Sequence, residues 1–366
     1  MATTGSKPVL FTGHEDFRTR IVLATLAGRA IKISGIRSDD LEPGLRDFEV
    51  SFLRLIEAVT NGSLIEISYT GTTVIYKPGL IIGGTHTHTP PLSRAVGYYI
   101  EPLLLLAPFG KKAMTITFKE CLTTSADDLG VDAIRTSIFP VMNKFGIDRQ
   151  ELRILKRGSA PLGGGEVVLS LPHLVLQPAT IHQTSAPVIN KIRGIAYSTR
   201  VSPATVNRIV ESAREVLRAT KCENFIYTDV ARGDEAGKSP GFGVTLVAET
   251  KVGGWNYSTE AVGTSGSTPE DLGKLISARL LEEISFGGAV SRNQVLMAIV
   301  FMVLGKEDIG RLCLSNRYLG DPKFIRLLRT VKKFWGVEAL IRDLNDDEFI
   351  CSIKGTGFVS SSKKIA

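Results

Sequence analysis

The most regular array of charged side chains lies in the segment 321–335. Lysine and arginine recur there at helical spacing around an apolar stripe. The cations are Lys323, Arg326, Arg329, Lys332 and Lys333, and the stripe is Ile325, Leu328, Val331 and Trp335. Such a face can bind the phosphate backbone of RNA, although most charged helix faces are only solvated. We predict a basic amphipathic helix and keep both interpretations of its charge.

A second candidate for anion binding is the glycine-rich segment from Lys156 to Gly165. Its glycines allow backbone N–H groups to converge on an anion, and Lys156 and Arg157 add positive charge. The segment lacks the GxxxxGK[ST] pattern of a P-loop, and three glycines between two predicted strands also form a tight turn. Local features favour the turn, and phosphate contact at Arg157 stays open.

Residues with metal-ligand chemistry are scattered. His86 and His88 are two positions apart, so on a strand both face one side, but no carboxylate or cysteine nearby offers a third ligand. Helix caps and turns account for the acidic pairs 39–40, 127–128 and 346–347. We therefore predict no metal site and no cofactor.

The elements that must position these residues follow one recurring pattern, an amphipathic helix, a glycine and then a strand. The strands are predicted at 30–34, 64–69, 113–118, 151–155 and 337–341. The glycines that precede them are Gly28, Gly62, Gly110, Gly146 and Gly336, each placed where a left-handed residue would end a helix. The chain is predicted to be an α/β protein of repeated helix-plus-sheet units without a fixed sequence period.

A change of composition after Pro172 divides the chain. Residues 177–190 are rich in Pro, Ser, Thr and Gln and predict a linker. A strand, a helix at 203–219 and three further strands follow within a compact stretch. We predict a first part of the core at 1–186, a smaller inserted α/β domain at 187–265 and the last part of the core at 266–366.

Composition fits a folded protein with an anionic partner. The 366 residues are 43% hydrophobic and 22% charged, with a net charge of +7. The longest apolar run, Val295–Leu304, is much shorter than the roughly 20 residues that a membrane-spanning helix needs, so no membrane contact is predicted. Four scattered cysteines without a CxxC motif predict free thiols.

Several motifs occur in an order that resembles the RNA 3′-terminal phosphate cyclase family. These are Arg18 with its short helix, 33–37, Glu42-Pro-Gly-Leu45, 76–80 with Gly83-Gly84, the glycine segment 157–165, and 287–294. The resemblance covers nearly the whole chain. It implies the fold of that family, with repeated helix-plus-sheet units and an inserted domain at about 191–262.

The chain departs from the family at the residues of catalysis. The active members adenylate a histidine in a His-x-x-Asp-Gln pattern, and the matching positions here begin with Val290, which cannot attack ATP. Phe11 stands at the position of a glutamate, and Phe48-Glu49 replaces a Gln-His pair. No catalytic residue is therefore predicted, and the chain is expected to be a pseudoenzyme.

Basic positions of the family are retained. Arg18, Arg37 and Lys77 match residues that bind the terminal phosphate or the nucleotide, and we expect them to converge on one anion-binding pocket. This combination resembles the nucleolar branch of the family, which lacks cyclase activity and acts in early pre-rRNA processing for 18S rRNA. The resemblance implies pre-rRNA, a nucleolar GTPase, and the small-subunit processome with its small nucleolar ribonucleoprotein as partners.

Two alternatives remain at the sequence level. One is a metal-independent pre-rRNA endonuclease that uses Arg329, Lys332 and a further group. It is disfavoured because the basic helix offers no histidine or carboxylate at helical spacing. The other is a module that binds RNA termini, which Phe11 disfavours.

Overall fold

Three of the sheets in the structure have the same topology. The computed structural model describes residues 7–363. In each of the three sheets the first strand pairs in parallel with the second, and the last two join antiparallel, in the spatial order first, second, fourth, third. One helix follows the first strand and another helical segment the second. The predicted repeat is thus confirmed as a repeat of structure.

Each of the three units contains four main strands and its helices, together with short elements. The first contains β1 (Val9–Thr12), α1 (Phe17–Ala27), β2 (Ile31–Ser34), α2 (Asp47–Val59), β4 (Leu64–Ile67) and β5 (Val74–Lys77). The short β3 (Thr60–Asn61), between α2 and β4, pairs with β6 (Leu80–Ile81), which follows β5. The second contains β7 (Gly84–His88), α3 (Gly97–Leu106), β8 (Met114–Cys121), α4 (Val131–Ala133), α5 (Phe139–Lys144), β9 (Glu151–Lys156) and β10 (Gly165–Leu171). The third contains β11 (His182–Gln183), α8 (Val295–Leu304), β16 (Ile309–Ser315), α9 (Pro322–Trp335), β17 (Ala339–Asp343) and β18 (Glu348–Lys354).

The glycines of the sequence pattern end helices in most places. Gly28 and Gly336 follow α1 and α9 with φ of 64° and 70°, and each donates its N–H to a carbonyl of the last turn. Gly62 and Gly146 also have positive φ. The expectation is wrong for Gly110, whose φ of −69° is accessible to any residue.

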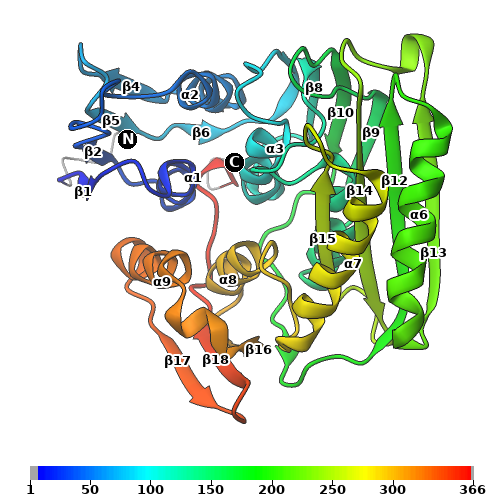
Figure 1. Cartoon of the computed structure of the whole chain (residues 1–366). Coiled ribbons are helices and arrows are strands. Elements are labelled where there is room, and N and C mark those ends of the chain that lie inside the picture. The colour runs from blue at the N-terminus through cyan, green and yellow to red at the C-terminus, as the bar shows by residue number, and fades with distance from the viewer. Residues whose placement is uncertain (1–6, 364–366) are drawn as a thin grey trace.

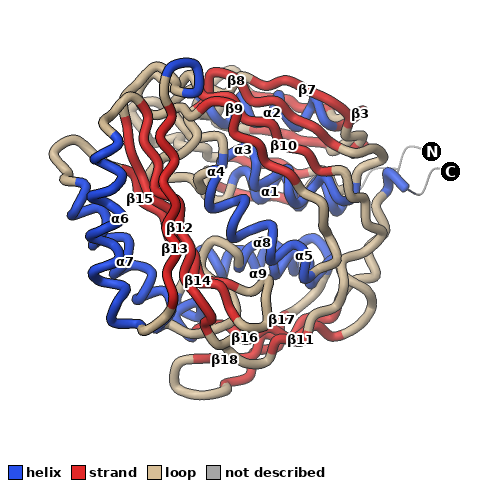
Figure 2. The backbone as a smooth tube through the Cα atoms, turned by 90° about the vertical axis from the view of Figure 1, so that its right-hand side faces the viewer, coloured by secondary structure: helices blue, strands red, loops and turns tan. Residues whose placement is uncertain are grey.

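The first helix of each unit lies in the centre of the molecule. Figures 1 and 2 show α1, α3 and α8 surrounded by the sheets, and α3 packs against both others. Burial extends around their circumference, since every residue of α3 except Glu101 and every residue of α8 except Leu296 is buried. The central helices therefore bring the three units together around one core.

The inserted unit has its own hydrophobic core. It contains β12 (Ile189–Thr199), α6 (Pro203–Leu217), β13 (Glu223–Ala231), β14 (Gly241–Thr250), β15 (Asn256–Val262) and α7 (Pro269–Ser285). Leu272, Ile276 and Leu280 of α7 pack with α6 and this sheet rather than with the central core. We therefore propose that the inserted unit ends after α7, beyond the boundary at 265, because α7 supplies half of its helical layer.

Three of the four positions of the apolar face of α9 are displaced by one residue from the predicted stripe, and Val331 is common to both. The buried apolar residues are Phe324, Leu327, Val331 and Phe334. Ile325, Leu328 and Trp335 are only half-buried at the margin of this face. The basic amphipathic helix is confirmed, but Phe324 and Phe334, rather than Ile325 and Trp335, anchor it to the core.

Two predictions about composition can be compared with the structure. Within residues 7–363 no helix has the length and apolar character needed to cross a membrane. The cysteines are free thiols, with Cys121, Cys313 and Cys351 buried and Cys222 partly buried.

Candidate functional site

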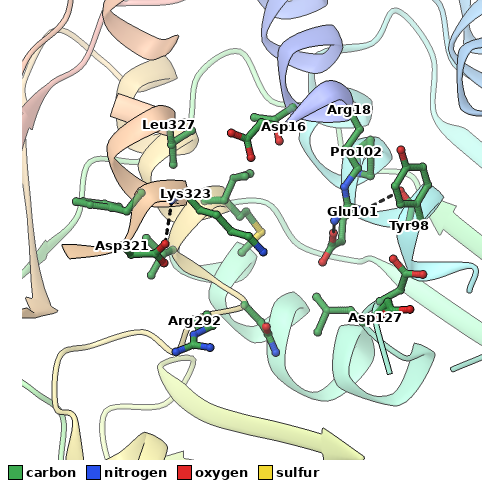
Figure 3. A pocket seen from close by; sticks show the side chains of 18 of the residues that line it. Asp16, Arg18, Tyr98, Glu101, Pro102, Asp127, Arg292, Asp321, Lys323 and Leu327 are labelled. Carbon is green, nitrogen blue, oxygen red and sulfur yellow. Dashed lines mark hydrogen bonds and ion pairs between the residues drawn. The ribbon is translucent and has the colours of Figure 1, made fainter. Parts of the chain in front are cut away.

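A central pocket lies where the three units and the inserted unit meet. Its volume is about 1170 Å³, and it is lined by the N-terminal ends of α1, α8 and α9, by α3, and by the C-terminal end of α7. Figure 3 shows side chains from these separate elements pointing towards one another. The repeat explains this convergence, because the first helix of every unit begins close to the centre.

Arg18 lines this pocket with its charge already paired. Its guanidinium forms an ion pair with Glu101 of α3, donates to the carbonyl of Tyr98 at 2.9 Å and lies 4.7 Å from the centre of the Tyr98 ring. Burial raises the pKa of Glu101, and Arg18 opposes that shift. An incoming anion would therefore compete with Glu101 for this arginine.

Arg37 also lines the pocket and is paired more completely. Two of its nitrogens donate to the carboxylate of Glu49, at 2.7 and 3.0 Å, and a third bond of 3.2 Å reaches the carbonyl of Gly44. Glu49 is 2% exposed. The residue that replaces the histidine of the family thus neutralises a retained arginine.

Lys77 does not join the two arginines. It ends β5, where the buried Tyr76 points into the core and the neighbouring position points outwards. Its side chain is 57% exposed and lies 4.0 Å from Glu66. The expected convergence of three cations is therefore wrong for Lys77, which lies outside the pocket lining.

Arg157 is a structural residue in this chain rather than an open phosphate ligand. It is 2% exposed and forms ion pairs of 2.8 Å with Asp132 and with Asp229 of the inserted unit. Its guanidinium lies 4.6 Å from the centre of the Tyr197 ring. Burial opposes its charge, but the two carboxylates outweigh burial and raise the pKa of Arg157.

The glycine segment around Arg157 forms a seam with the loop before β14. Gly237 donates to the carbonyl of Arg157 at 2.6 Å, and Lys238 donates to the carbonyl of Gly163 at 2.8 Å. A Cβ at Gly237 would lie 2.2 Å from the carbonyl oxygen of Gly163. The glycines therefore allow two backbones to approach, which supports the turn over the phosphate loop.

The segment that matches the catalytic motif is buried at its first position. Val290 is 1% exposed and belongs to the central core. Gln294 donates to Ser137 and Asn256 at 2.7 Å each and accepts from the Ser291 N–H at 3.0 Å. The segment thus supports a buried polar network, and Val290, which the resemblance matches to the nucleophile of the family, is a buried hydrocarbon.

Phe11, the second position at which the resemblance indicates a substitution, is also buried in apolar surroundings. Phe11 is 6% exposed, and its ring centre lies 5.9 Å from that of Phe334 on α9. Arg20 and Lys333 approach the same ring at 5.0 and 4.7 Å. An aromatic contact between the first and third units therefore replaces a carboxylate.

Charge in the pocket is mixed rather than uniformly basic. Three exposed cations in its lining, Arg279, Arg292 and Lys323, have no ion pair within the described part of the chain. Figure 3 shows Lys323 extending from α9 into the space opposite Arg18 and Glu101. Glu260 accepts from the Gly130 N–H at 2.9 Å, and burial raises its pKa to about 8. These free cations are the positions most open to an anion.

The cations of α9 are divided between two surfaces. Arg326 faces the pocket and pairs with Asp16 at 2.5 Å. On the outer side, Lys332 pairs with Glu338 at 2.5 Å, and the Nζ of Lys333 lies 3.4 Å from the carbonyl of Leu10. Arg329 is exposed and has no ion pair among residues 7–363.

Sequence reasoning missed Glu101, Arg279 and the role of Arg292 and Lys323 in the pocket. Glu101 had a usable signal, because it is the only charged residue in the apolar stretch 95–110. Arg279 had no such signal, since its position depends on how α7 meets the other units.

Among residues 7–363 no three potential ligands gather as a metal site. The His86 ring forms a hydrogen bond of 3.0 Å with the Gly83 carbonyl, and the His88 ring forms one of 3.0 Å with Ser51.

The chain belongs to the RNA 3′-terminal phosphate cyclase family, whose family model matches residues 9–341. It is 54% identical to the rRNA processing protein RCL1 of Saccharomyces cerevisiae, over 100% of both chains. It is 44% identical to the rRNA processing protein rcl1 of Schizosaccharomyces pombe, over 97% of this chain and 98% of that protein. It is 42% identical to the human RNA 3′-terminal phosphate cyclase-like protein, over 99% of each.

Proposed function

We propose that this chain is a ribosome-biogenesis factor that binds pre-rRNA and has no cyclase activity. The observation that carries the proposal is Val290, a buried hydrocarbon where active members of the family have the histidine that attacks ATP. The names of its relatives, which refer to rRNA processing and to a cyclase-like protein, support the same assignment. The specific role proposed is early processing for 18S rRNA and the small subunit.

The remodelled pocket supports loss of nucleotide chemistry beyond the nucleophile. Glu49 neutralises Arg37, Glu101 neutralises Arg18, and Phe11 makes an aromatic contact. The two ion pairs occupy guanidinium donors that a triphosphate would need, and the ring of Phe11 offers neither a donor nor a metal-binding oxygen. The cations that stay unpaired, Arg279, Arg292 and Lys323, retain attraction for an RNA phosphate.

Pre-rRNA is accordingly the proposed main partner, with nucleolar localisation. A nucleolar GTPase of ribosome assembly and the small-subunit processome with its small nucleolar ribonucleoprotein are proposed as protein partners, on the resemblance alone. Binding of RNA termini is the weaker form of the same proposal, because the two retained arginines of the pocket are both paired.

A second candidate is metal-independent cleavage of pre-rRNA. It gains support from the lining of the pocket, where His14 and Glu15 lie in the same cavity as Arg326 and Lys323. A general acid and base beside cations are the groups that such cleavage needs, and the basic helix alone lacks them. We keep the role of a binding factor as the proposal, and cleavage is tested separately.

Crosslinking to pre-rRNA in cells, mapped to nucleotide and residue, tests the proposal. We expect crosslinks from the pocket rim and from the outer side of α9. Purified protein with pre-rRNA fragments should show binding without a cut. Specific cleavage that disappears in His14→Ala would establish the nuclease instead, and absence of any RNA crosslink would refute the proposed function.

A further inference from the structure

Exposed aromatic side chains are concentrated on one strand. Among the phenylalanine, tyrosine and tryptophan residues of the described chain, only Tyr69, Phe225 and Tyr227 are exposed, and the last two lie on β13 of the inserted unit. Phe225 is 43% and Tyr227 59% exposed. Leaving two neighbouring aromatic rings in water is costly, so this pair is a candidate for contact with a ligand.

Both rings lie on the face of the sheet opposite α6 and α7. Ile226, between them, is buried in the core of the inserted unit, and side chains alternate along a strand. The Cα atoms of the two aromatic residues are therefore about 6.6 Å apart, with both side chains on one face. Arg193 lies beside Phe225 on β12, and Ile195 lies beside Tyr227.

The strand that carries them is at the edge of its sheet. Figure 1 shows β13 at the outer border of the molecule, and its only partner in the sheet is β12. Cations flank it, with Lys221 just before the strand and Arg232 just after it. Both are exposed and have no ion pair in the part of the chain that is described.

We propose that single-stranded RNA lies along β13 and stacks two bases on Phe225 and Tyr227. The inference rests on the proposed RNA-binding function and extends it to a second surface, separate from the central pocket. Exposed aromatics on a strand, on the face of a four-stranded sheet opposite its helices, can stack unpaired bases. The open part of that face is the edge at β13, because Thr245 and Val247 on the same face of β14 are buried. Lys221 and Arg232 are positioned to approach the phosphates, whereas Arg193 is paired with Glu249 at 3.4 Å.

Single-stranded RNA fits this surface better than duplex RNA or a peptide. Bases in a duplex are already stacked on one another, so two exposed rings on an edge strand contribute little to duplex binding. An extended peptide would bind the main chain at the edge of β13 and would not require aromatic side chains there. Cations at both ends of the strand complement the backbone of a nucleic acid.

The test measures binding of the full chain to a ten-nucleotide oligouridylate and to an RNA duplex of equal length. Phe225→Ala and Tyr227→Ala should each weaken binding of the single strand by at least about fivefold. Duplex affinity and the salt dependence of single-strand binding should not change, because no phosphate contact is lost. Melting temperature should also stay the same, since both side chains are exposed.

Two controls keep the result specific. Tyr69→Ala removes the remaining exposed aromatic and should leave the affinity for the single strand unchanged. A double variant with Phe225→Tyr and Tyr227→Phe keeps both rings and should retain binding. If the wild type binds oligouridylate and the variant with both Phe225→Ala and Tyr227→Ala binds it equally well, the proposal that bases stack on β13 is wrong and the RNA-binding proposal stands. If the wild type binds neither RNA, both proposals fail.

Discussion

At the scale of single residues, two arginines of the central pocket are neutralised within the fold. Arg37 and Arg18 are retained, but Glu49 and Glu101 hold their guanidiniums in ion pairs. To bind such an arginine, a phosphate must lose its own hydration and must also displace the carboxylate that is already paired with it. An acidic residue beside an arginine is therefore sufficient to neutralise its charge in the fold.

Val290→His should fail to restore cyclase chemistry. The position is 1% exposed. The resemblance also assigns Phe11 and Glu49 to two further positions at which this chain departs from the active members. We expect no labelled protein–AMP from either form after incubation with ATP, and no 2′,3′-cyclic phosphate on RNA. The melting temperature of the variant confirms that it is folded, and an adduct on the unmutated protein would contradict the proposed loss of activity.

Glu49→Gln should make the stability of the protein dependent on phosphate. Arg37 then lacks a counter-charge, which we expect to lower the free energy of unfolding by on the order of 2 kcal/mol. Phosphate can replace the missing carboxylate, so it should raise the melting temperature of the variant more than that of the wild type. Chloride at equal ionic strength is the control, and equal phosphate shifts in both proteins would refute this view of Arg37.

Glu260 should give the protein a pH-dependent stability that Glu260→Gln removes. Burial raises the folded pKa to about 8 from 4.5, so the folded state binds the extra proton. The resulting stabilisation is complete below pH 4.5 and is lost as the pH rises to about 8. The melting temperature of the wild type should fall relative to that of the variant across this interval; parallel curves would exclude the shift.

At the scale of elements, α9 connects the core to two charged surfaces. Its buried face holds Phe324, Leu327 and Phe334, while Arg326 reaches the pocket and Arg329 points to the outside. The helix can therefore lose its outer cations without losing its packing. Its contact with Phe11 joins the third unit to the first.

The triple variant Arg329→Ala, Lys332→Ala and Lys333→Ala should weaken RNA binding and leave folding intact. Each phosphate contact removed makes the negative slope of log K against log salt less steep by about 0.7 to 0.9. Stability should change by about 0.5 kcal/mol or less for each substitution, because all three positions are exposed. Affinity and salt slope are measured beside the melting temperature.

A matched control for that variant is Lys111→Ala with Lys112→Ala, two exposed cations of the second unit. It should retain the wild-type salt slope. Unchanged RNA binding by the triple variant would assign the outer side of α9 to simple solvation. Lost cleavage at unchanged affinity would favour the nuclease.

Local patterns predicted the elements better than their faces. The ends of α1 and α9 follow from Gly28 and Gly336, since a left-handed residue stops a helix wherever it occurs. The buried side of α9 did not follow, because Phe324 and Ile325 are adjacent and both apolar. The choice between them depends on the surfaces of α1 and α8, which no local pattern contains.

At the scale of the whole molecule, the site depends on contacts between distant segments. Arg18 meets Glu101, and Arg157 meets Asp229, across long stretches of sequence. The family resemblance identified Arg18 and Arg157 as cations of interest but carried no information on the carboxylates that pair with them. The two arginines that the sequence suggests as anion ligands are therefore neutralised in the fold by carboxylates from distant segments.

The seam at Arg157 also determines how the inserted unit is held. Backbone bonds from Gly237 and Lys238 join the loop before β14 to the glycine segment of the second unit. Ser159 adds a side-chain bond of 2.8 Å to Thr199. The inserted unit has a hydrophobic core of its own, so this seam is required for its placement rather than for its folding.

Gly237→Ala should loosen this placement. The new Cβ would lie 2.2 Å from the carbonyl oxygen of Gly163, and neither backbone can move without breaking the bonds of the seam. We expect a lower melting temperature and a separation of the single unfolding transition into two, as the inserted unit unfolds independently. Gly320→Ala, where the added Cβ meets nothing within 4 Å, is the matched control and should behave like the wild type. One cooperative transition at an unchanged temperature in Gly237→Ala would show that the seam does not hold the two parts together.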